Sequence, residues 1–202
     1  MDTVGLLLAA GLSRRMGDFK PLMRVGGQTL VEACARSLLN GGVSRVVAVL
    51  GYRQAEVAEA LKRTVHAETL TLAVNADYAA TDMLASVRVG LMALPACDAF
   101  YLLPGDMPAV SPATFRALAD TLQQTGASVA FPMWEGRRGH PPLIAARCIP
   151  TLSGYQGENG LRGVWRQFAG QTAELPTTDA GCAMDADTPE DFDALIRYLE
   201  NR

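Results

Sequence analysis

The segment of residues 9–20 combines glycines with positive charge. Gly11 and Gly17 allow the backbone to fold tightly and to turn its N–H groups toward an anion. Arg15, the arginine before it and Lys20 place cationic side chains in the same stretch. This combination suits a polyphosphate, and the alternative is a glycine-containing surface turn whose arginines are solvated. The P-loop pattern Gly-x-x-x-x-Gly-Lys-Ser/Thr is absent. The dinucleotide pattern Gly-x-Gly-x-x-Gly is absent too, which argues against a Rossmann dehydrogenase.

Two aspartates, Asp106 and Asp187, are candidate metal ligands. Mg2+ is usually held by one or two carboxylates together with substrate phosphates and water. Asp106 follows an apolar run and precedes a proline-containing turn, so its alternative role is that of a turn residue without a metal. Asp187 precedes an expected helix start, where a carboxylate can simply favour the positive end of the helix dipole. Asp185 is a reserve candidate.

His140 and Arg162 stand in two glycine-containing segments further along the chain. His140 belongs to Gly-His-Pro, and Arg162 follows the glycine-rich stretch of residues 157–160. An acceptor molecule that carries a phosphate would find charge partners in such turns. By themselves both signals are weak. His140 is equally consistent with a histidine that has only a structural role.

The elements that must position these residues alternate between two patterns. Short β-branched or leucine-rich runs predict strands over residues 4–8, 45–50, 70–74, 99–103 and 128–132. Between and after them lie helical patterns, which together predict an α/β fold with a mostly parallel sheet. In such sheets ligands bind beyond the carboxyl ends of the strands. The segments that follow residues 8 and 103 are therefore the expected places for a site.

Two helices have readable ends. Leu30, Cys34 and Leu38 follow the spacing of one helix face, and the adjacent glycines 41 and 42 supply a stop. Near the C-terminus, Thr188 is an expected N-cap with proline at the first helical position, ahead of an apolar stripe at residues 192–199.

Composition sets the limits of the interpretation. With 202 residues and 49% hydrophobic residues, the sequence predicts a single domain over residues 1–202. A net charge of -3 argues against a nucleic-acid binder, because phosphate contacts need a concentrated basic surface. No run approaches the roughly 20 apolar residues of a membrane span. The four dispersed cysteines favour reduced thiols, and we expect a cytoplasmic location.

The run from Leu8 to Gly17, followed by Lys20, resembles the signature of the MobA-like NTP transferase family. Within that family the chain is most similar to the molybdenum cofactor cytidylyltransferases. Further motifs occur in the family's order: Asn75-Ala76-Asp77-Tyr78, Ser86-Val87-Arg88, Gly105-Asp106-Met107-Pro108, Gly139-His140-Pro141 and Asp185-Ala186-Asp187-Thr188-Pro189. The resemblance therefore covers nearly the whole chain and implies a Rossmann-like three-layer fold.

The resemblance also implies roles for individual residues. The nucleotide-binding residues would be Leu8, Ala9, Ala10, Gly11, Arg15, Lys20, Asn75, Ser86 and Asp106, with Arg15, Lys20 and Asp106 also catalytic. The backbone of residues 9–11 would meet the base and ribose, while the two cationic side chains hold the phosphates. Asp106 and Asp187 would bind Mg2+, and His140 and Arg162 would bind the acceptor. Asp82 stands where the family usually has glycine.

The implied reaction is attack by an acceptor phosphate oxygen on the α-phosphate of a nucleoside triphosphate, with release of pyrophosphate. CTP is favoured because Ala9-Ala10-Gly11 stands where the related guanylyltransferases have Ala-Gly-Gly. The implied acceptor is molybdopterin that carries molybdenum. The alternatives are guanylyl transfer, transfer to a sugar or alcohol phosphate, and a non-catalytic module that delivers cofactor to a molybdenum enzyme or its chaperone. The presence of both Asp106 and Asp187 argues against the last.

Overall fold

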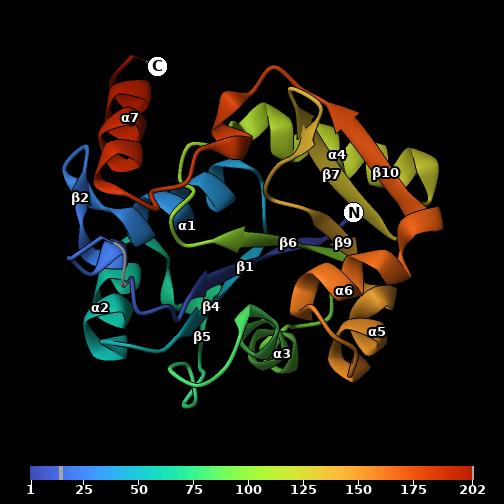
Figure 1. Ribbon diagram of the computed structural model, residues 1–202, viewed down its shortest axis with the longest axis horizontal. Coiled ribbons are helices and arrows are strands. Elements are labelled where there is room, and N and C mark those ends of the chain that lie inside the picture. The colour runs from blue at the N-terminus through green and yellow to red at the C-terminus, as the bar shows by residue number, and fades with distance from the viewer. Residues whose placement is uncertain (14–15, 202) are drawn as a thin grey trace.

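A central sheet lies between two layers of helices in the computed structural model, which describes residues 1–13 and 16–201 (Figure 1). The strand order is β10-β7-β9-β6-β1-β4-β5, with β8 paired to β7. The strands are β1 (Thr3–Ala9), β4 (Arg45–Leu50), β5 (Leu70–Val74), β6 (Ala99–Pro104), β7 (Val129–Trp134), β8 (Arg137–Arg138), β9 (Leu143–Ala145) and β10 (Thr172–Pro176). Pairing is parallel except around β8 and β9, which confirms the mostly parallel α/β sheet.

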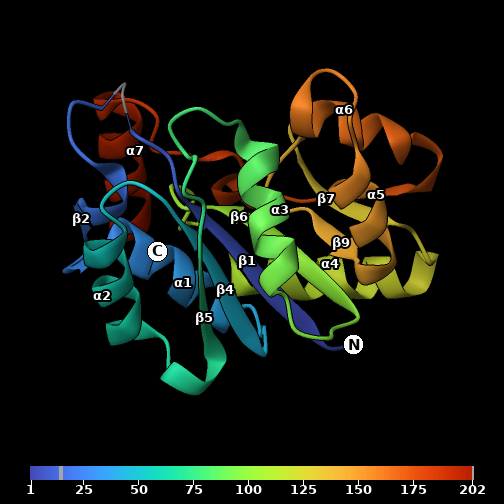
Figure 2. The same ribbon diagram turned by 90° about the horizontal axis from the view of Figure 1, so that it is seen from below.

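The helices cover both faces of this sheet. They are α1 (Leu30–Asn40), α2 (Gln54–Thr64), α3 (Met83–Ala93), α4 (Pro112–Thr125), α5 (Ile149–Gly154), α6 (Gly160–Gln167) and α7 (Pro189–Glu200). Helices α1 and α4 lie on one face, and α3, α5 and α6 lie on the other, as the two perpendicular views show (Figures 1 and 2). A small hairpin of β2 (Arg24–Val25) and β3 (Gln28–Thr29) precedes α1. In the described part of the chain, no helix combines the length and apolarity needed to cross a membrane.

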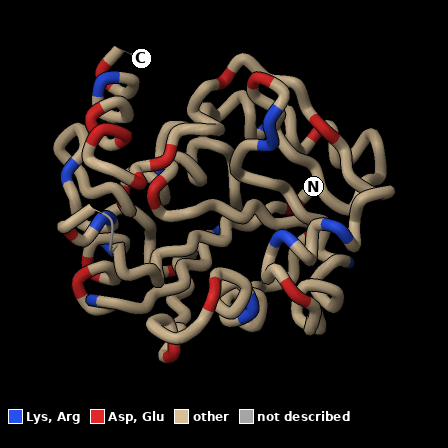
Figure 3. Tube along the Cα trace, viewed as in Figure 1, with Lys and Arg blue, Asp and Glu red and all other residues tan. Residues whose placement is uncertain are grey.

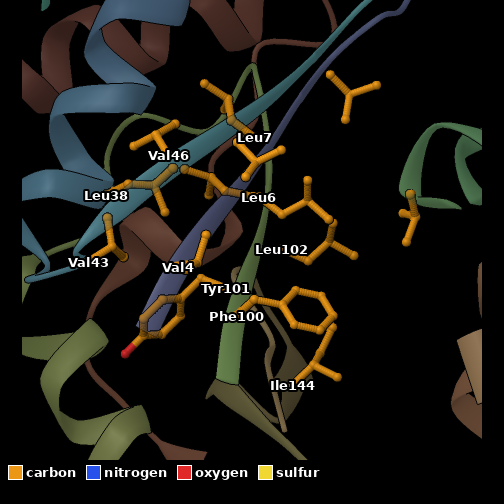
Figure 4. Close-up of a cluster of buried hydrophobic side chains, with 14 of the residues drawn as sticks. Val4, Leu6, Leu7, Leu38, Val43, Val46, Phe100, Tyr101, Leu102 and Ile144 are labelled. Carbon is orange, nitrogen blue, oxygen red and sulfur yellow. The ribbon is translucent and has the colours of Figure 1, made fainter. Parts of the chain in front are cut away.

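Strand β1 is buried on both faces because it sits in the middle of the sheet (Figure 4). Its Leu6 and Leu7 are fully shielded from solvent. On the α3 side, a side chain at Gly90 would overlap Leu6, so this glycine lets α3 approach the sheet closely. A continuous apolar run, rather than an alternating one, is what a parallel central strand requires.

The two expected helix ends are confirmed. Thr188 caps α7 by accepting a hydrogen bond from the backbone N–H of Asp191, whose carboxylate in turn accepts one from the backbone N–H of Thr188. At the other helix, α1 ends at Asn40 with Gly41 as its C-cap, and Gly42 adopts a left-handed conformation with φ of +94°. Charged residues of both signs are scattered over the chain trace (Figure 3).

Candidate active site

The chain leaves β1 and β6 in opposite directions at the carboxyl edge of the sheet. β1 pairs with both β4 and β6, but the chain proceeds from β1 to β4 and β5 before it crosses back to β6. Such a switch in strand order opens a crevice between neighbouring loops. A hollow of about 400 Å3 lies there. Its walls come from the β1 loop, the loop before α3 and the residues after β6. The first and the last of these are the segments in which the sequence predicted a site.

Most of the predicted nucleotide-binding residues line this hollow. They are Leu8, Ala9, Ala10, Gly11, Lys20, Ser86 and Asp106. Arg15, predicted to hold phosphate, lies outside the described residues. The hollow has further wall residues that the sequence reading did not single out, among them Ser13, Tyr78 and Thr81. Ser13 and Tyr78 belong to motifs that the sequence analysis noted, whereas Thr81 gives no separate signal.

Lys20 lies at the centre of the charged part of the site. It begins a short 3-10 helix, η1 (Lys20–Leu22), and its backbone N–H donates to Ser13 Oγ at 3.1 Å. Only 7% of the residue is exposed. Its Nζ donates to Asp187 Oδ1 at 2.6 Å and to Asp106 Oδ2 at 3.3 Å. Side chains from three distant segments therefore meet at one ammonium group.

Asp106 and Asp187, the carboxylate pair, fit a divalent cation. Both face one cationic atom, Lys20 Nζ, and both are partly exposed, so a second cation can reach them from solvent. Within residues 1–13 and 16–201, no group of three or more Asp, Glu, His or Cys side chains is arranged to hold a metal. Mg2+ is typically bound by one or two carboxylates, while substrate phosphates and water complete its coordination shell. Reserve candidate Asp185 has a raised pKa, because of desolvation and then the neighbouring Asp187 and Asp106.

Gly105 brings the two site loops into contact. Its backbone N–H donates to the carbonyl of Leu8 at 2.8 Å, and an added Cβ would lie 2.8 Å from that same oxygen. Gly105→Ala should therefore force the backbone apart and lower the free energy of unfolding by about 1–3 kcal/mol in urea denaturation. The matched control is Gly154→Ala, where an added Cβ meets nothing within 4 Å. Equal stability of the two variants would contradict this close approach.

Asn75, predicted to line the base pocket, lies behind the wall of the hollow. The residue is buried, and its Nδ2 donates to Ser86 Oγ at 3.0 Å and to Thr81 Oγ1 at 3.1 Å. Its Oδ1 accepts from the backbone N–H of Asp77 at 3.1 Å. Asn75 thus holds in place two side chains that do line the hollow. Its contact with a base stays a prediction.

Asp82 has a clear local role. Its carboxylate caps α3 by accepting from the backbone N–H of Ala85 at 3.0 Å. Aspartate is among the preferred N-cap residues, which accounts physically for a carboxylate where the related family usually has glycine. Asp82 also lines the hollow, so the cap and the pocket wall are the same residue.

The two predicted acceptor residues occupy different surroundings. His140 is partly buried, and its backbone N–H donates to the carbonyl of Cys182 at 2.8 Å; the His140–Pro141 peptide is cis. Arg162 is exposed in the first turn of α6, which packs on α3. Neither residue lines the hollow. Their assignment to acceptor binding stays a prediction.

Burial lowers the pKa of His140 below its ordinary value, and the Asp106 carboxylate offsets part of this effect. As the pH falls below about 6.5, the His140 imidazole therefore becomes protonated in the unfolded chain before it does so in the native protein. Stability that is present at neutral pH should be lost in this range. We expect His140→Gln to flatten the decline of unfolding free energy between about pH 7 and about pH 5. His66→Gln, at an exposed histidine, is the control; a wild-type slope in His140→Gln would refute the expectation.

The hollow at the switch point of the sheet, with Lys20 and a carboxylate pair beside it, has the space and the charges that nucleotidyl transfer requires. The chain belongs to the MobA-like NTP transferase family, because residues 5–174 match the model of that domain. The family supplies the class of chemistry, and the predicted family membership and enzyme class are both confirmed.

Individual relatives are similar to this protein over nearly the full length of both chains. The sequence is 31% identical to the molybdenum cofactor cytidylyltransferase of Escherichia coli, covering 96% of each chain. It is also 31% identical to the nicotine blue oxidoreductase of Paenarthrobacter nicotinovorans, covering 95% of each. A probable molybdenum cofactor guanylyltransferase of Opitutus terrae is 28% identical, covering 94% of this chain and 92% of the relative.

Solved structures confirm the fold. A nucleotidyl transferase from Methanothermobacter superposes with a TM-score of 0.83 at 23% identity, covering 100% of this chain and 99% of that one. Rv0371c from Mycobacterium tuberculosis, solved in complex with manganese, superposes with a TM-score of 0.71 at 23% identity, covering 98% and 99%.

Proposed function

We propose that the protein transfers CMP from CTP to the phosphate of a molybdopterin-type acceptor, with Mg2+ as its metal and pyrophosphate as the second product. The observation that carries the proposal is that Lys20 and Asp106, which line the hollow, meet Asp187 at one ammonium group. Nucleotidyl transfer needs negative charge neutralised around a triphosphate, and this arrangement offers both a cation and a metal-binding carboxylate pair for that purpose.

The bond changes follow from the chemistry of phosphates. An oxygen of the acceptor phosphate attacks the α-phosphorus, a new P–O bond forms, and the bond to the β-phosphate breaks with its electron pair leaving on pyrophosphate. A phosphomonoester is largely dianionic at pH 7, since its second pKa is about 6. The attacking group therefore needs no strong general base from the protein.

The protein's own residues would position the substrates and stabilise the charge that develops on the phosphates. Asp106 and Asp187 would hold the metal, and a bound Mg2+ would supply positive charge to the phosphate oxygens. Lys20 Nζ, already fixed between the two carboxylates, would stabilise charge that gathers on the leaving pyrophosphate. Ala9, Ala10 and Gly11 line the hollow, where backbone groups can meet the base and ribose.

Two nucleotides are candidates. The Ala9-Ala10-Gly11 sequence and the similarity to a cytidylyltransferase favour CTP. The similarity to guanylyltransferases supports GTP as the second candidate. Asp82 does not separate them, because its carboxylate could accept hydrogen bonds from the amino group of either base.

Manganese in a solved structure of the same fold supports a divalent metal, and Mg2+ is the proposed physiological one.

The test is a screen of pyrophosphate release from each of the four nucleoside triphosphates, with and without molybdopterin and with and without Mg2+. We expect release only when CTP, molybdopterin and Mg2+ are present together. Preference for GTP would correct the nucleotide, and release with a sugar phosphate would correct the acceptor. Nucleotide binding without any release would support a non-catalytic delivery module and contradict the proposal.

A further inference from the structure

Asp179 is the centre of a hydrogen-bond network outside the hollow. It lies in the segment of residues 177–187, which runs from β10 to α7 and ends at Asp187 (Figure 1). Its Oδ2 accepts from the backbone N–H of Ser111 and from Thr114 Oγ1, both at 2.7 Å. Its Oδ1 accepts from the backbone N–H of Gly181 at 3.1 Å and from Tyr198 Oη at 3.4 Å.

The two oxygens of Asp179 hold the two elements that follow the carboxylate pair. Oδ2 holds the start of α4, because Ser111 is its N-cap, a few residues after Asp106. Oδ1 holds α7 through Tyr198, and the N-cap of that helix follows Asp187 directly. One carboxylate thereby ties together the segments on which both members of the pair are mounted.

Close packing around the network leaves little room for these segments to slide. A side chain at Gly181 would overlap the carbonyl of Ala109, which lies in the Asp106 loop. A side chain at Gly139 would lie 2.6 Å from the carbonyl oxygen of Cys182, which also accepts the backbone N–H of His140. The short helix η5 (Ala180–Ala183) thus packs between the Asp106 loop and the segment that contains His140.

We propose that Asp179 is a positioning residue that sets the spacing of Asp106 and Asp187 for metal binding. The inference rests on the proposed function insofar as it takes the carboxylate pair to be the metal site. An ionised carboxylate only accepts hydrogen bonds, and the four groups named above all donate to it. Asparagine would turn an N–H group toward either the Ser111 or the Gly181 N–H, so the network has to shift in Asp179→Asn. Mutation of a group that hydrogen-bonds directly to a metal ligand typically costs about 10–100-fold in metal affinity. Asp179 acts one step further out, through the segments that carry the two ligands, so we expect the lower end of that range.

The test measures metal binding directly. Mn2+ is titrated into the protein and followed by electron paramagnetic resonance, both alone and with a non-hydrolysable CTP analogue. We expect Asp179→Asn to raise the Kd for Mn2+ at least about tenfold. Asp193→Asn, which removes the same charge from an exposed position on α7, should bind Mn2+ like the wild type.

Two milder variants keep the test decisive if Asp179→Asn does not fold. Thr114→Val removes one donor on the α4 side, and Tyr198→Phe removes one on the α7 side. Each should raise the Kd for Mn2+ in the same direction, by a smaller factor. Wild-type affinity in all folded variants would overturn the proposal, as would a wild-type protein that does not bind Mn2+. A wild type that binds Mn2+ but releases no pyrophosphate would instead refute the proposed function, while the variants still decide the role of Asp179.

Discussion

Asp106→Asn is expected to abolish metal-dependent pyrophosphate release, by at least about a thousandfold, and to leave the protein folded. The amide keeps the size of the side chain but removes the negative charge that a divalent cation requires. A metal ion contributes several kcal/mol to stabilisation of charge in such reactions, and about 1.4 kcal/mol corresponds to a factor of ten. The carboxylate of Asp106 is partly exposed, so its loss creates no cavity in the core. Steady-state release with the preferred triphosphate and acceptor measures the effect.

The matched control is Asp120→Asn, which removes one negative charge from an exposed position on α4. It should keep wild-type release. Circular dichroism and urea denaturation show whether each variant is folded. Release at the wild-type rate in a folded Asp106→Asn protein would mean that this carboxylate does not hold the metal.

Lys20→Met should weaken triphosphate binding by about 10–100-fold, because a hydrogen bond to a charged group contributes about 1.5–3 kcal/mol. Methionine retains the apolar stem of this buried residue, so the change isolates the ammonium group. Isothermal titration calorimetry with the triphosphate measures the Kd. The control is Lys62→Met, whose exposed side chain pairs with Glu59 on α2.

A second consequence of Lys20→Met concerns stability. Without the ammonium group, Asp106 and Asp187 lose the cation that both of them contact. The free energy of unfolding should fall, and divalent cation should restore part of it, since a ligand that binds only the native state stabilises it. Unchanged triphosphate affinity in this variant would argue against a phosphate role for Lys20.

The parts of the fold that were predicted from the sequence have strong local signals. The apolar runs of β1, β4, β5 and β6 and the caps of α7 are each explained by neighbouring residues in the chain. Helix α4 carried an equally readable signal, with Ser111 as N-cap, proline at its first position and Gly126 at its end, but was not predicted. Strand β9 has three residues, and it exists because β6 and β7 pair with it on either side. Such a strand is set by distant partners rather than by its own pattern.

The same distinction applies to the site. Lys20 and Asp187 are 167 positions apart, and no pattern within the chain places them in contact. Their contact was not predicted: the family resemblance implied a phosphate role for Lys20 and a metal role for Asp187, but no direct pairing of the two. Asp179 gave no signal, because its network joins residues from three separate segments. Asn75 was recognised as part of a motif, but whether it faces the hollow or supports the wall depends on the hydrogen bonds of Ser86 and Thr81.

The fate of the α-phosphate tests the central claim most directly. CTP labelled radioactively at the α-phosphorus is incubated with the protein, Mg2+ and molybdopterin, and the products are separated. Nucleotidyl transfer predicts that the label moves to the acceptor in a one-to-one ratio with unlabelled pyrophosphate, and that Asp106→Asn stops both. Label that remains in CTP, or that leaves as free CDP or CMP without joining the acceptor, would contradict the account.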